Sequence, residues 1–415
     1  MTQLADWFVW SSRSKIDQSE NVGDPLGIAD QTQSNSNHLR GIKMLHEIRA
    51  LIESRSSFRI HPDGPTAIKT SDGASGGVLE CVTSGSSGVP KIIRRSHRSW
   101  IASFEVNASL FDLSSGDTYA VFGSLSHSLS LYGVLEAVHI GADLCLLAGL
   151  RADRQLKALQ KTPVTTLYVT PTQIENLITV ADQNLRIESV KRIFIGGGAL
   201  STLLADKCKS IFPAADLSPF YGASETSFIT LANSQSPEGS VGTAYRDVEI
   251  SIREATGQVT NEIGEIWVRS PYLFIGYADP VASDTRHQDG FVTVGEFGSL
   301  DQAGNLFIKG RKSRMVTIAD QNVFPDEIEQ FLMTHYTAGP VAVVAVPDDK
   351  RGHRLAVVVA GQAYHTDLDR ALQLCRKTLG AHHTPKYTFF IKDLPQLVSG
   401  KLDYNAIYAW IEDKQ

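Results

Sequence analysis

Short apolar runs alternate with helical patterns between Gly77 and about Tyr221, and no other feature limits the fold of this chain as strongly. The runs have the length and composition of strands, and a stretch with helical spacing lies at 173–180 between two of them. They lie at 118–122, 143–147, 166–169 and 192–195. Alternating strands and helices favour an α/β fold in which the strands form a mostly parallel sheet.

The pattern changes near residue 248. Residues 248–253 alternate strictly between apolar and polar side chains, and strand-like runs follow at 265–269 and 305–308, which is typical of an antiparallel β region. Beyond a boundary at 310–314, a helix that begins at Pro325 and further strand-like runs indicate a small α+β unit. We expect three parts: an atypical, shortened N-terminal lead at 1–76, a core domain at 77–310 and a C-terminal domain at 311–415.

The lead itself divides in two. Residues 11–38 are rich in Ser, Asn, Gln and Asp, which predicts a loose or surface-hugging segment. From Ile42 onward, apolar residues recur at helical spacing, which predicts an amphipathic helix.

Composition excludes several classes of function. The 415-residue chain has a net charge of −6 and no basic run, so it lacks an electrostatic footprint for nucleic acid or an anionic membrane. Its most apolar long stretch, 131–150, contains Glu136, His139 and Asp143 and is unsuited to span a membrane. The four cysteines show neither metal-ligand nor disulfide spacing. Because the N-terminus also does not read as a signal peptide, we expect a cytoplasmic protein.

A loop rich in Gly and Ser follows the strand-like run at 77–82. It reads Thr83, Ser84, Gly85, Ser86, Ser87, Gly88, Val89, Pro90 and Lys91. Glycines allow close backbone approach to an anion, hydroxyls add donors, and the lysine adds charge, so the loop suits a polyphosphate. It lacks the Gly-Lys-Ser/Thr ending of a Walker loop. Composition alone fits an ordinary surface loop equally well.

This loop closely resembles the phosphate-loop signature of the adenylate-forming superfamily, which includes acyl- and aryl-CoA synthetases, luciferases and the adenylation domains of peptide synthetases. Further segments resemble the other signatures of that superfamily, in the same order, from residue 79 to about 405. They are 124–127, 196–200, 221–225, 264–269 with 276–277, 310–311, 322–329, and 394–395 with 399–401.

The resemblance implies a large α/β domain followed by a small mobile lid, and a two-step reaction. ATP and Mg²⁺ convert a carboxylic acid to acyl-AMP with release of pyrophosphate, and a pantetheine thiol, of CoA or of a carrier protein, then takes the acyl group. The resemblance assigns the following residues to nucleotide binding: Thr83, Ser84, Gly85, Ser86, Ser87, Gly88, Gly197, Gly198, Ala199, Tyr221, Gly222, Glu296 and Arg311.

The resemblance also assigns catalytic and substrate residues. Lys91, Ser224, Glu225 and Lys401 are the catalytic candidates, and Glu225 is also the Mg²⁺ ligand, because a hard cation prefers carboxylate oxygen. The acid-binding candidates are His127, Leu131, Ala223 and Phe228, with Gly198 beside them. Taken alone, Glu225 also fits a salt-bridged surface residue, and His127 also fits a structural histidine.

The chain departs from the superfamily pattern at several positions. Glu296 replaces the usual Asp that holds the ribose, Arg314 replaces the usual Asp or Lys of the hinge, and Asp320 replaces a Gly. That Gly lets the pantetheine arm pass close to the backbone, so Asp320 weakens the case for CoA and favours a carrier protein. The lead before Thr83 is also short, which leaves two alternatives open: one wall of the core is missing, or a second copy of the chain covers it.

Three functions follow. The first is the two-step ligase, with an aryl or medium-length acid, because no aspartate is found to hold an α-amino group. The second is a ligase that stops at acyl-AMP and passes the acyl group to another nucleophile. The third is a non-catalytic nucleotide-binding relative.

Overall fold

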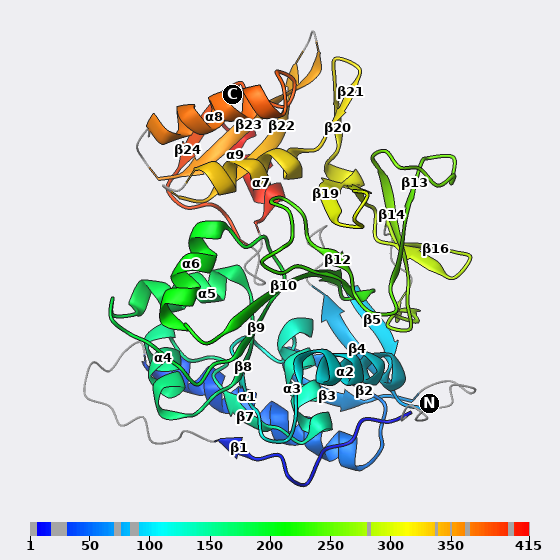
Figure 1. The fold of residues 1–415 in the computed structure, drawn as a ribbon, viewed down its shortest axis with the longest axis vertical. Helices are drawn as coiled ribbons and strands as arrows, with labels where there is room; N and C mark the ends of the chain where they lie inside the picture. Colours follow the sequence, from blue (N-terminus) through cyan, green and yellow to red (C-terminus); the bar gives the residue numbers. More distant parts are fainter. Residues whose placement is uncertain are drawn as a thin grey trace.

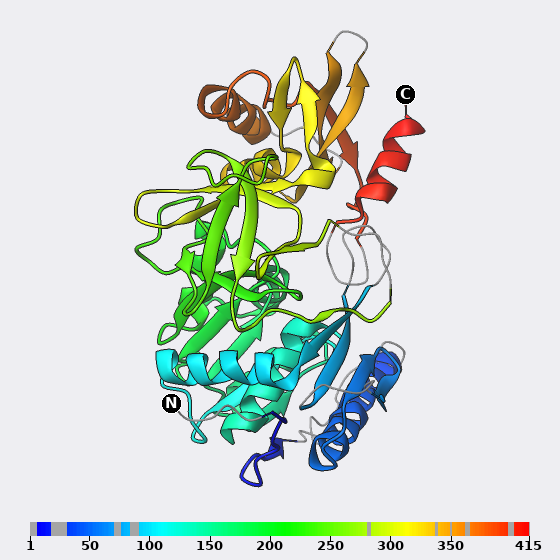
Figure 2. The ribbon, with the colours of Figure 1, turned by 90° about the vertical axis from the view of Figure 1, so that its right-hand side faces the viewer.

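The computed structural model describes residues 6–17, 31–69, 76–83, 91–279, 284–336, 339–348, 351–361, 366–396 and 402–414. A large domain carries most of the chain, and a smaller C-terminal domain lies against one end of it (Figures 1 and 2). The α/β fold with a small C-terminal domain is thereby confirmed.

An eight-stranded sheet forms the centre of the large domain, with strand order β1-β7-β6-β8-β9-β10-β11-β12. Neighbouring strands from β1 to β10 run parallel, while β11 and β12 pair antiparallel at the end of the sheet. The strands are β1 (Ile16–Asp17), β6 (Thr118–Val121), β7 (Asp143–Leu146), β8 (Thr166–Val169), β9 (Arg192–Ile195), β10 (Asp216–Ala223), β11 (Ser227–Leu231) and β12 (Thr243–Ala244). The four expected strands therefore form, within one residue of the expected ends.

Helices cover both faces of this sheet because alternate residues of each strand point to opposite sides. One core cluster joins Tyr119, Leu144 and Tyr168 to α1 (Gln31–Glu53), α2 (His97–Phe111) and α3 (Ser128–Ile140). The other joins Leu167 and Ile193 to the remaining helices of the domain. These are α4 (Ala152–Lys161), α5 (Pro171–Val180) and α6 (Thr202–Ile211).

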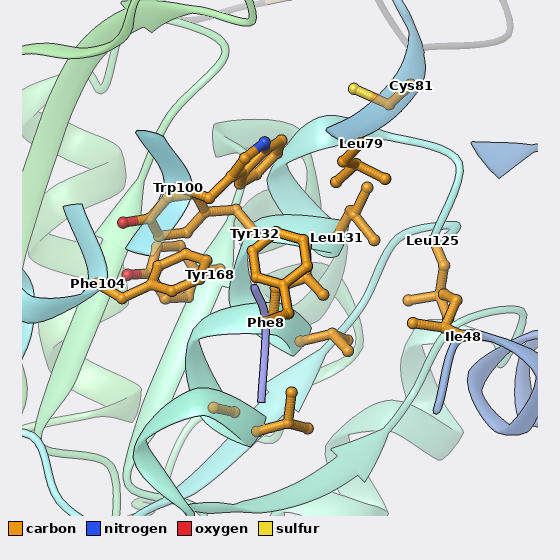
Figure 3. Packing of buried hydrophobic residues seen from close by; sticks show 14 of the residues in the cluster. Phe8, Ile48, Leu79, Cys81, Trp100, Phe104, Leu125, Leu131, Tyr132 and Tyr168 are labelled. Carbon is orange, nitrogen blue, oxygen red and sulfur yellow. The ribbon is translucent and has the colours of Figure 1, made fainter. Parts of the chain in front are cut away.

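The N-terminal lead is packed into the large domain more fully than the sequence predicts. The expected loose segment at 11–38 instead contains β1, which extends the central sheet, and the beginning of α1 at Gln31. Phe8 and Trp10 are buried in the first core cluster. Figure 3 shows Phe8 in this cluster together with Ile48 of α1. Burial of these apolar side chains outweighs the polar composition around them.

Two further sheets complete the large domain. The order β15-β5-β4-β2-β3 forms a five-stranded sheet from β2 (Phe58–His61), β3 (Gly64–Ala67), β4 (Val78–Thr83), β5 (Lys91–Ser96) and β15 (Gly276–Tyr277). The expected antiparallel region is confirmed as a six-stranded sheet. It contains β13 (Glu249–Arg253), β14 (Gly264–Arg269), β16 (Arg286–Gln288), β17 (Phe291–Thr293), β18 (Glu296–Leu300) and β19 (Leu306–Arg311).

The C-terminal domain begins after a short 3₁₀ turn, Lys312–Arg314. A hairpin of β20 (Val316–Ile318) and β21 (Gln321–Val323) precedes a three-stranded sheet of β22 (Val341–Asp348), β23 (Gly352–Ala360) and β24 (Tyr387–Ile391). Its helices are α7 (Pro325–His335), α8 (Thr366–Thr378) and α9 (Tyr404–Glu412). Among the described residues, no helix combines the length and apolar character needed to cross a membrane.

Candidate active site

Lys91, Glu225 and Tyr277 meet at the edge of the five-stranded sheet. Tyr277 on β15 donates a hydrogen bond from its hydroxyl to Glu225 Oε1 at 2.9 Å, and its hydroxyl is 2.8 Å from Thr285 Oγ1. The Lys91 ammonium lies 5.7 Å from the centroid of the Tyr277 ring. A carboxylate with a tyrosine hydroxyl beside it offers the hard oxygen atoms that suit Mg²⁺.

The phosphate-loop candidates are anchored at this place. Thr83 at the end of β4 pairs with Lys91 at the start of β5, and the Lys91 ammonium faces the Tyr277 ring. Ser84, Gly85, Ser86, Ser87 and Gly88 lie outside the described residues, as does the catalytic candidate Lys401.

The segment 221–225 comprises the end of β10 and the start of the turn that leads to β11. Gly222 is required here, because a Cβ atom at this position would lie 2.0 Å from the backbone oxygen of Ser227. The turn brings Ser224 next to α3, where its hydroxyl is 3.0 Å from that of Ser128. His127 is the N-terminal capping residue of α3, so Ser224 and His127 lie at the same edge of the central sheet.

Glu296 is the shared acceptor of a half-buried hydrogen-bonded group. The Tyr221 hydroxyl donates to Glu296 Oε2, and Arg311 Nε donates to Oε1 at 3.3 Å from the opposite position on β19. Burial, together with the neighbouring Glu296 carboxylate, raises the pKa of Tyr221 well above its ordinary value. Burial lowers the pKa of Arg311, but Glu296 outweighs this effect and the net pKa is raised. Each carboxylate oxygen has a second lone pair, so Glu296 can accept further hydroxyl donors.

The glycines that follow β9 lie at the carboxyl end of the parallel strands of the central sheet. A Cβ atom on Gly196 would lie 2.2 Å from the Phe220 ring, and Gly197 has a φ of +83°, so both positions demand glycine. Gly197, Gly198 and Ala199 are exposed, and the segment ends where Ser201 caps α6.

The four acid-binding candidates divide into two groups. His127 and Ala223 are half-buried at the site. Leu131 and Phe228 are 0% and 3% exposed and belong to the core cluster. Figure 3 shows Leu131 within it. Phe228 packs against Tyr132 with ring centroids 5.2 Å apart and against Phe220 at 4.4 Å. These two candidates therefore lie beneath the surface of the site rather than on it.

A buried polar network lies next to these aromatic rings. Glu136 of α3 accepts from Asn107 Nδ2 at 2.8 Å, from the Tyr168 hydroxyl at 2.7 Å and from the Tyr119 hydroxyl at 3.1 Å. Burial raises the pKa of Glu136 to about 7 even though these hydrogen bonds lower it. Tyr168 in turn stacks on Phe194 at 4.6 Å. The network thereby fixes part of the aromatic layer behind the site.

Arg314 is held tightly within the C-terminal domain. It donates to Asp326 Oδ1 and to the Val343 carbonyl, each at 2.6 Å, and its guanidinium lies 3.6 Å from the centroid of the Tyr404 ring. The Tyr404 hydroxyl donates to Glu329 at 2.6 Å, and Glu329 is 3.6 Å from Arg314. A rotation between the domains would therefore carry the Arg314 side chain with the C-terminal domain.

The turn between β20 and β21 contains two residues with left-handed backbone. Ala319 has a φ of +49° and Asp320 a φ of +63°, as a two-residue type I′ hairpin requires. Glycine is favoured at such positions, so Asp320 departs from the superfamily pattern without changing the path of the backbone.

Tyr277 is the residue that the sequence reasoning missed. Its neighbour Gly276 and Tyr277 itself were expected as a motif, but no role followed from their position in the sequence. Only the pairing of β15 with β5 brings the Tyr277 hydroxyl to Glu225.

A mostly parallel central sheet in a large domain, followed by a small α+β domain, is the architecture of the adenylate-forming enzymes. The model of the AMP-binding enzyme family matches residues 62–278, and that of its C-terminal domain matches residues 327–401. The chain therefore belongs to the AMP-binding enzyme family. The family and the acyl-CoA ligases among its relatives make the chain an AMP-forming acid–thiol ligase.

Known relatives are similar in sequence to this chain over most of its length. An uncharacterized acyl-CoA ligase, YhfT, of Bacillus subtilis is 32% identical over 336 residues, which cover 80% of this chain and 68% of the relative. A putative long chain fatty acid-CoA ligase, VraA, of Staphylococcus aureus is 29% identical over 77% of this chain and 68% of its own length.

Solved structures share the fold. The o-succinylbenzoate CoA synthetase MenE of Bacillus subtilis, in complex with ATP and magnesium, has a TM-score of 0.69 and 25% identity over 80% of this chain and 69% of that one. The same enzyme with its acyl-adenylate intermediate has a TM-score of 0.71 and 24% identity over 83% of this chain and 70% of that one.

Proposed function

We propose that the chain is an acid–CoA ligase for an aryl or medium-length acid, and that the edge formed by Lys91, Glu225 and Glu296 is its adenylation site. The observation that carries this proposal is the convergence of Glu225, Tyr277 and Lys91 beside Thr83, the residue that pairs with Lys91. The names of the CoA-ligase relatives support CoA as the acceptor.

Glu225 would hold Mg²⁺, and the oxygen donors around it fit that ion. The bound Mg²⁺ supplies positive charge that offsets the charge of the triphosphate. Lys91 and Lys401 would reduce the repulsion between the acid carboxylate and the α-phosphate, and Ser224 would donate a hydroxyl hydrogen bond nearby. Glu296, with Tyr221 and Arg311 fixing its orientation, would accept from the ribose hydroxyls.

The acid would enter between α3 and the turn at 221–225, beside His127 and Ala223. Phe228 and Leu131 belong to the core cluster beneath this acid-binding region and would form its floor, with Phe228 held by its ring contacts to Tyr132 and Phe220. Dense ring packing there favours a flat aryl group or a medium-length acyl group over a long chain.

The domain boundaries of the sequence interpretation stay proposals, with the lead at 1–76, the core at 77–310 and the lid at 311–415. They are supported by β19, which ends at Arg311 in a large-domain sheet, and by β20, which begins a separate hairpin at Val316. We propose the backbone between them, at Arg314, as the hinge. A cytoplasmic location, a carrier-protein partner and a homodimer remain predictions from the sequence.

The test is acid-dependent exchange of labelled pyrophosphate into ATP across aryl, fatty and amino acids, followed by thioester formation with CoA or with a holo carrier protein. We expect exchange with an aryl or medium-length acid and thioester on CoA. Exchange without thioester would favour the ligase that stops at acyl-AMP. No exchange with any acid would favour the non-catalytic relative.

A further inference from the structure

Asn107 of α2 lies at the centre of the buried polar network and is 0% exposed. Its Nδ2 donates to Glu136 Oε1 at 2.8 Å and lies 3.2 Å from the hydroxyls of two tyrosines, Tyr132 and Tyr168. Its Oδ1 accepts from the Tyr245 hydroxyl at 2.7 Å. Tyr132 and Tyr168 lie together in the core (Figure 3), with ring centroids 5.5 Å apart. One amide therefore joins α2 to α3, to β8 and to the segment after β12.

Two of these tyrosines pack on Phe228. Tyr245 stacks on the Phe228 ring with centroids 5.1 Å apart, and Tyr132 meets it edge to face at 5.2 Å. The Tyr245 hydroxyl is held by its bond to Asn107. The Tyr132 hydroxyl lies beside the Asn107 amide and donates to Ser103 Oγ at 2.9 Å. The network therefore fixes the orientation of two rings that contact Phe228.

Phe228 is tied to the turn that forms one side of the proposed acid-binding region. On β11 it pairs with Gly222 of β10, which directly precedes Ala223. A Cβ atom on Gly222 would lie only 3.3 Å from the Phe228 Cα, so the two backbones are in close contact. The other side of that region is α3, which carries Tyr132. A shift of the Phe228 ring would therefore change both the floor and one side of the acid-binding region.

The ordinary explanation for such a network is that every buried donor and acceptor needs a partner. That explanation accounts for the hydrogen bonds but not for the presence of polar groups in this core. Burial of the Glu136 carboxyl group is costly, and apolar side chains of similar size often stabilise a core at least as well. A fully hydrogen-bonded network instead imposes one arrangement on rings that could otherwise pack in several ways.

We propose that Asn107 and Glu136 are positioning residues that determine which length of acid the enzyme accepts, by holding Tyr132 and Tyr245 against Phe228. This rests on the proposed acid–CoA ligase function. Neither residue touches the reacting atoms, and both act through the rings that they orient. Rings that are fixed beneath the acid exclude a long chain, whereas rings that can move would admit one. The network thereby selects an aryl or medium-length acid.

The test removes a single hydroxyl. Tyr245→Phe keeps the ring on Phe228 and deletes the hydrogen bond to Asn107. Pyrophosphate exchange is measured with benzoic acid and with straight-chain acids of increasing length. We expect the KM for the best wild-type acid to rise about three- to tenfold. The KM for ATP should stay at its wild-type value, and exchange with longer acids should increase relative to that with the best wild-type acid.

Tyr272→Phe is the matched control. Tyr272 is also 0% exposed, and its ring lies 5.4 Å from that of Tyr245. Its hydroxyl, however, donates to the Arg246 carbonyl, outside the network around Asn107. This variant should keep the wild-type KM for each acid and the wild-type preference for acid length.

Glu136→Gln is a second variant that keeps the size of the side chain and weakens its role as an acceptor, and it should cause the same changes as Tyr245→Phe. It provides the test should Tyr245→Phe not fold. Equal rises in the KM for the acid and for ATP would indicate a general loss of structure and overturn the proposal. An unchanged preference for acid length would also overturn it. Both results leave the adenylation proposal standing, because exchange continues.

Exchange in the wild type separates this inference from the proposed function. If the wild type exchanges pyrophosphate with no acid, the proposed function fails and this inference fails with it.

Discussion

The proposed adenylation edge of the large domain differs in its charge pairing from a cavity of about 200 Å³ in the C-terminal domain, which is lined by Arg351, Arg354, Arg376 and Lys386 among other residues. At the adenylation edge, both oxygens of Glu296 and one of Glu225 already accept hydrogen bonds from the protein. In the cavity, three cations have no ion pair within the described part of the chain. The first region is therefore ordered by its own hydrogen bonds, whereas the second carries positive charge that a bound anion would compensate.

The largest effect on activity is expected from removal of the Glu225 carboxylate. We expect Glu225→Ala to lower pyrophosphate exchange by about 10²- to 10³-fold, because the carboxylate that would hold Mg²⁺ is lost. Glu238→Ala is the matched control, since Glu238 is exposed, and should keep wild-type exchange. A fully active Glu225→Ala enzyme would show that this edge is not the adenylation site.

The next effect concerns the hydrogen-bonded group around Glu296. Glu296→Ala leaves the Tyr221 hydroxyl and Arg311 without their shared acceptor, so we expect the KM for ATP to rise about 10- to 100-fold. Glu296→Asp keeps a carboxylate that can accept both hydrogen bonds, so its KM for ATP should stay within about a few-fold of the wild-type value. Steady-state exchange rates at varied ATP measure both. Equal loss in the two variants would contradict a ribose-binding role.

Glu136 is a third case in the contrast between paired and unpaired charges, because it is a buried carboxylate without an ion pair in the described residues. Its raised pKa, about 7, means that the folded state holds a proton that the unfolded state has lost above pH 4 to 5. Wild-type stability should therefore fall as pH rises through 7. Relative to Glu136→Gln, we expect a loss of about 2.5 kcal/mol in the free energy of unfolding between pH 5 and pH 8.

Denaturant unfolding at the two pH values measures this difference. Glu105→Gln, an exposed position on the neighbouring helix α2, should show no such pH dependence. A constant difference between wild type and Glu136→Gln across this range would contradict a proton-binding Glu136.

A smaller effect is expected in the hairpin beside the cavity. Asp320→Gly removes a carboxylate from the path of a phosphorylated acceptor, so thioester formation should rise about two- to fivefold while pyrophosphate exchange stays constant. Asp320→Asn separates charge from size. A gain in both variants assigns the effect to charge, and no gain in either shows that Asp320 does not hinder the acceptor.

The smallest effect concerns backbone strain at Ala319. An alanine in left-handed backbone is disfavoured, and glycine removes this cost but adds entropy to the unfolded chain. Ala319→Gly should therefore raise the free energy of unfolding by about 0.5–1 kcal/mol. Ala360→Gly, at the end of β23 with ordinary strand backbone, should instead destabilise. Thermal unfolding of the two variants measures the contrast.

Much of the fold could be predicted because the patterns involved are local. Strand runs such as 166–169 and the helix beginning at Pro325 depend on periodicity and capping, which neighbouring residues determine. The lead could not be predicted in this way. Its polar composition gives no sign that Phe8 and Trp10 are buried. The partner of β1 is β7, more than a hundred residues away.

The sequence by itself determined the class of chemistry, because the loop at 83–91, the segment 221–225 and Glu296 are recognisable as short runs of residue types. The tertiary structure alone decided which groups meet. It brought Tyr277 to Glu225, placed Leu131 in the core, and gathered Arg351, Arg376 and Lys386 around one cavity. The physical reason is that such contacts depend on sheet pairing and side-chain packing between distant segments, which no local pattern encodes.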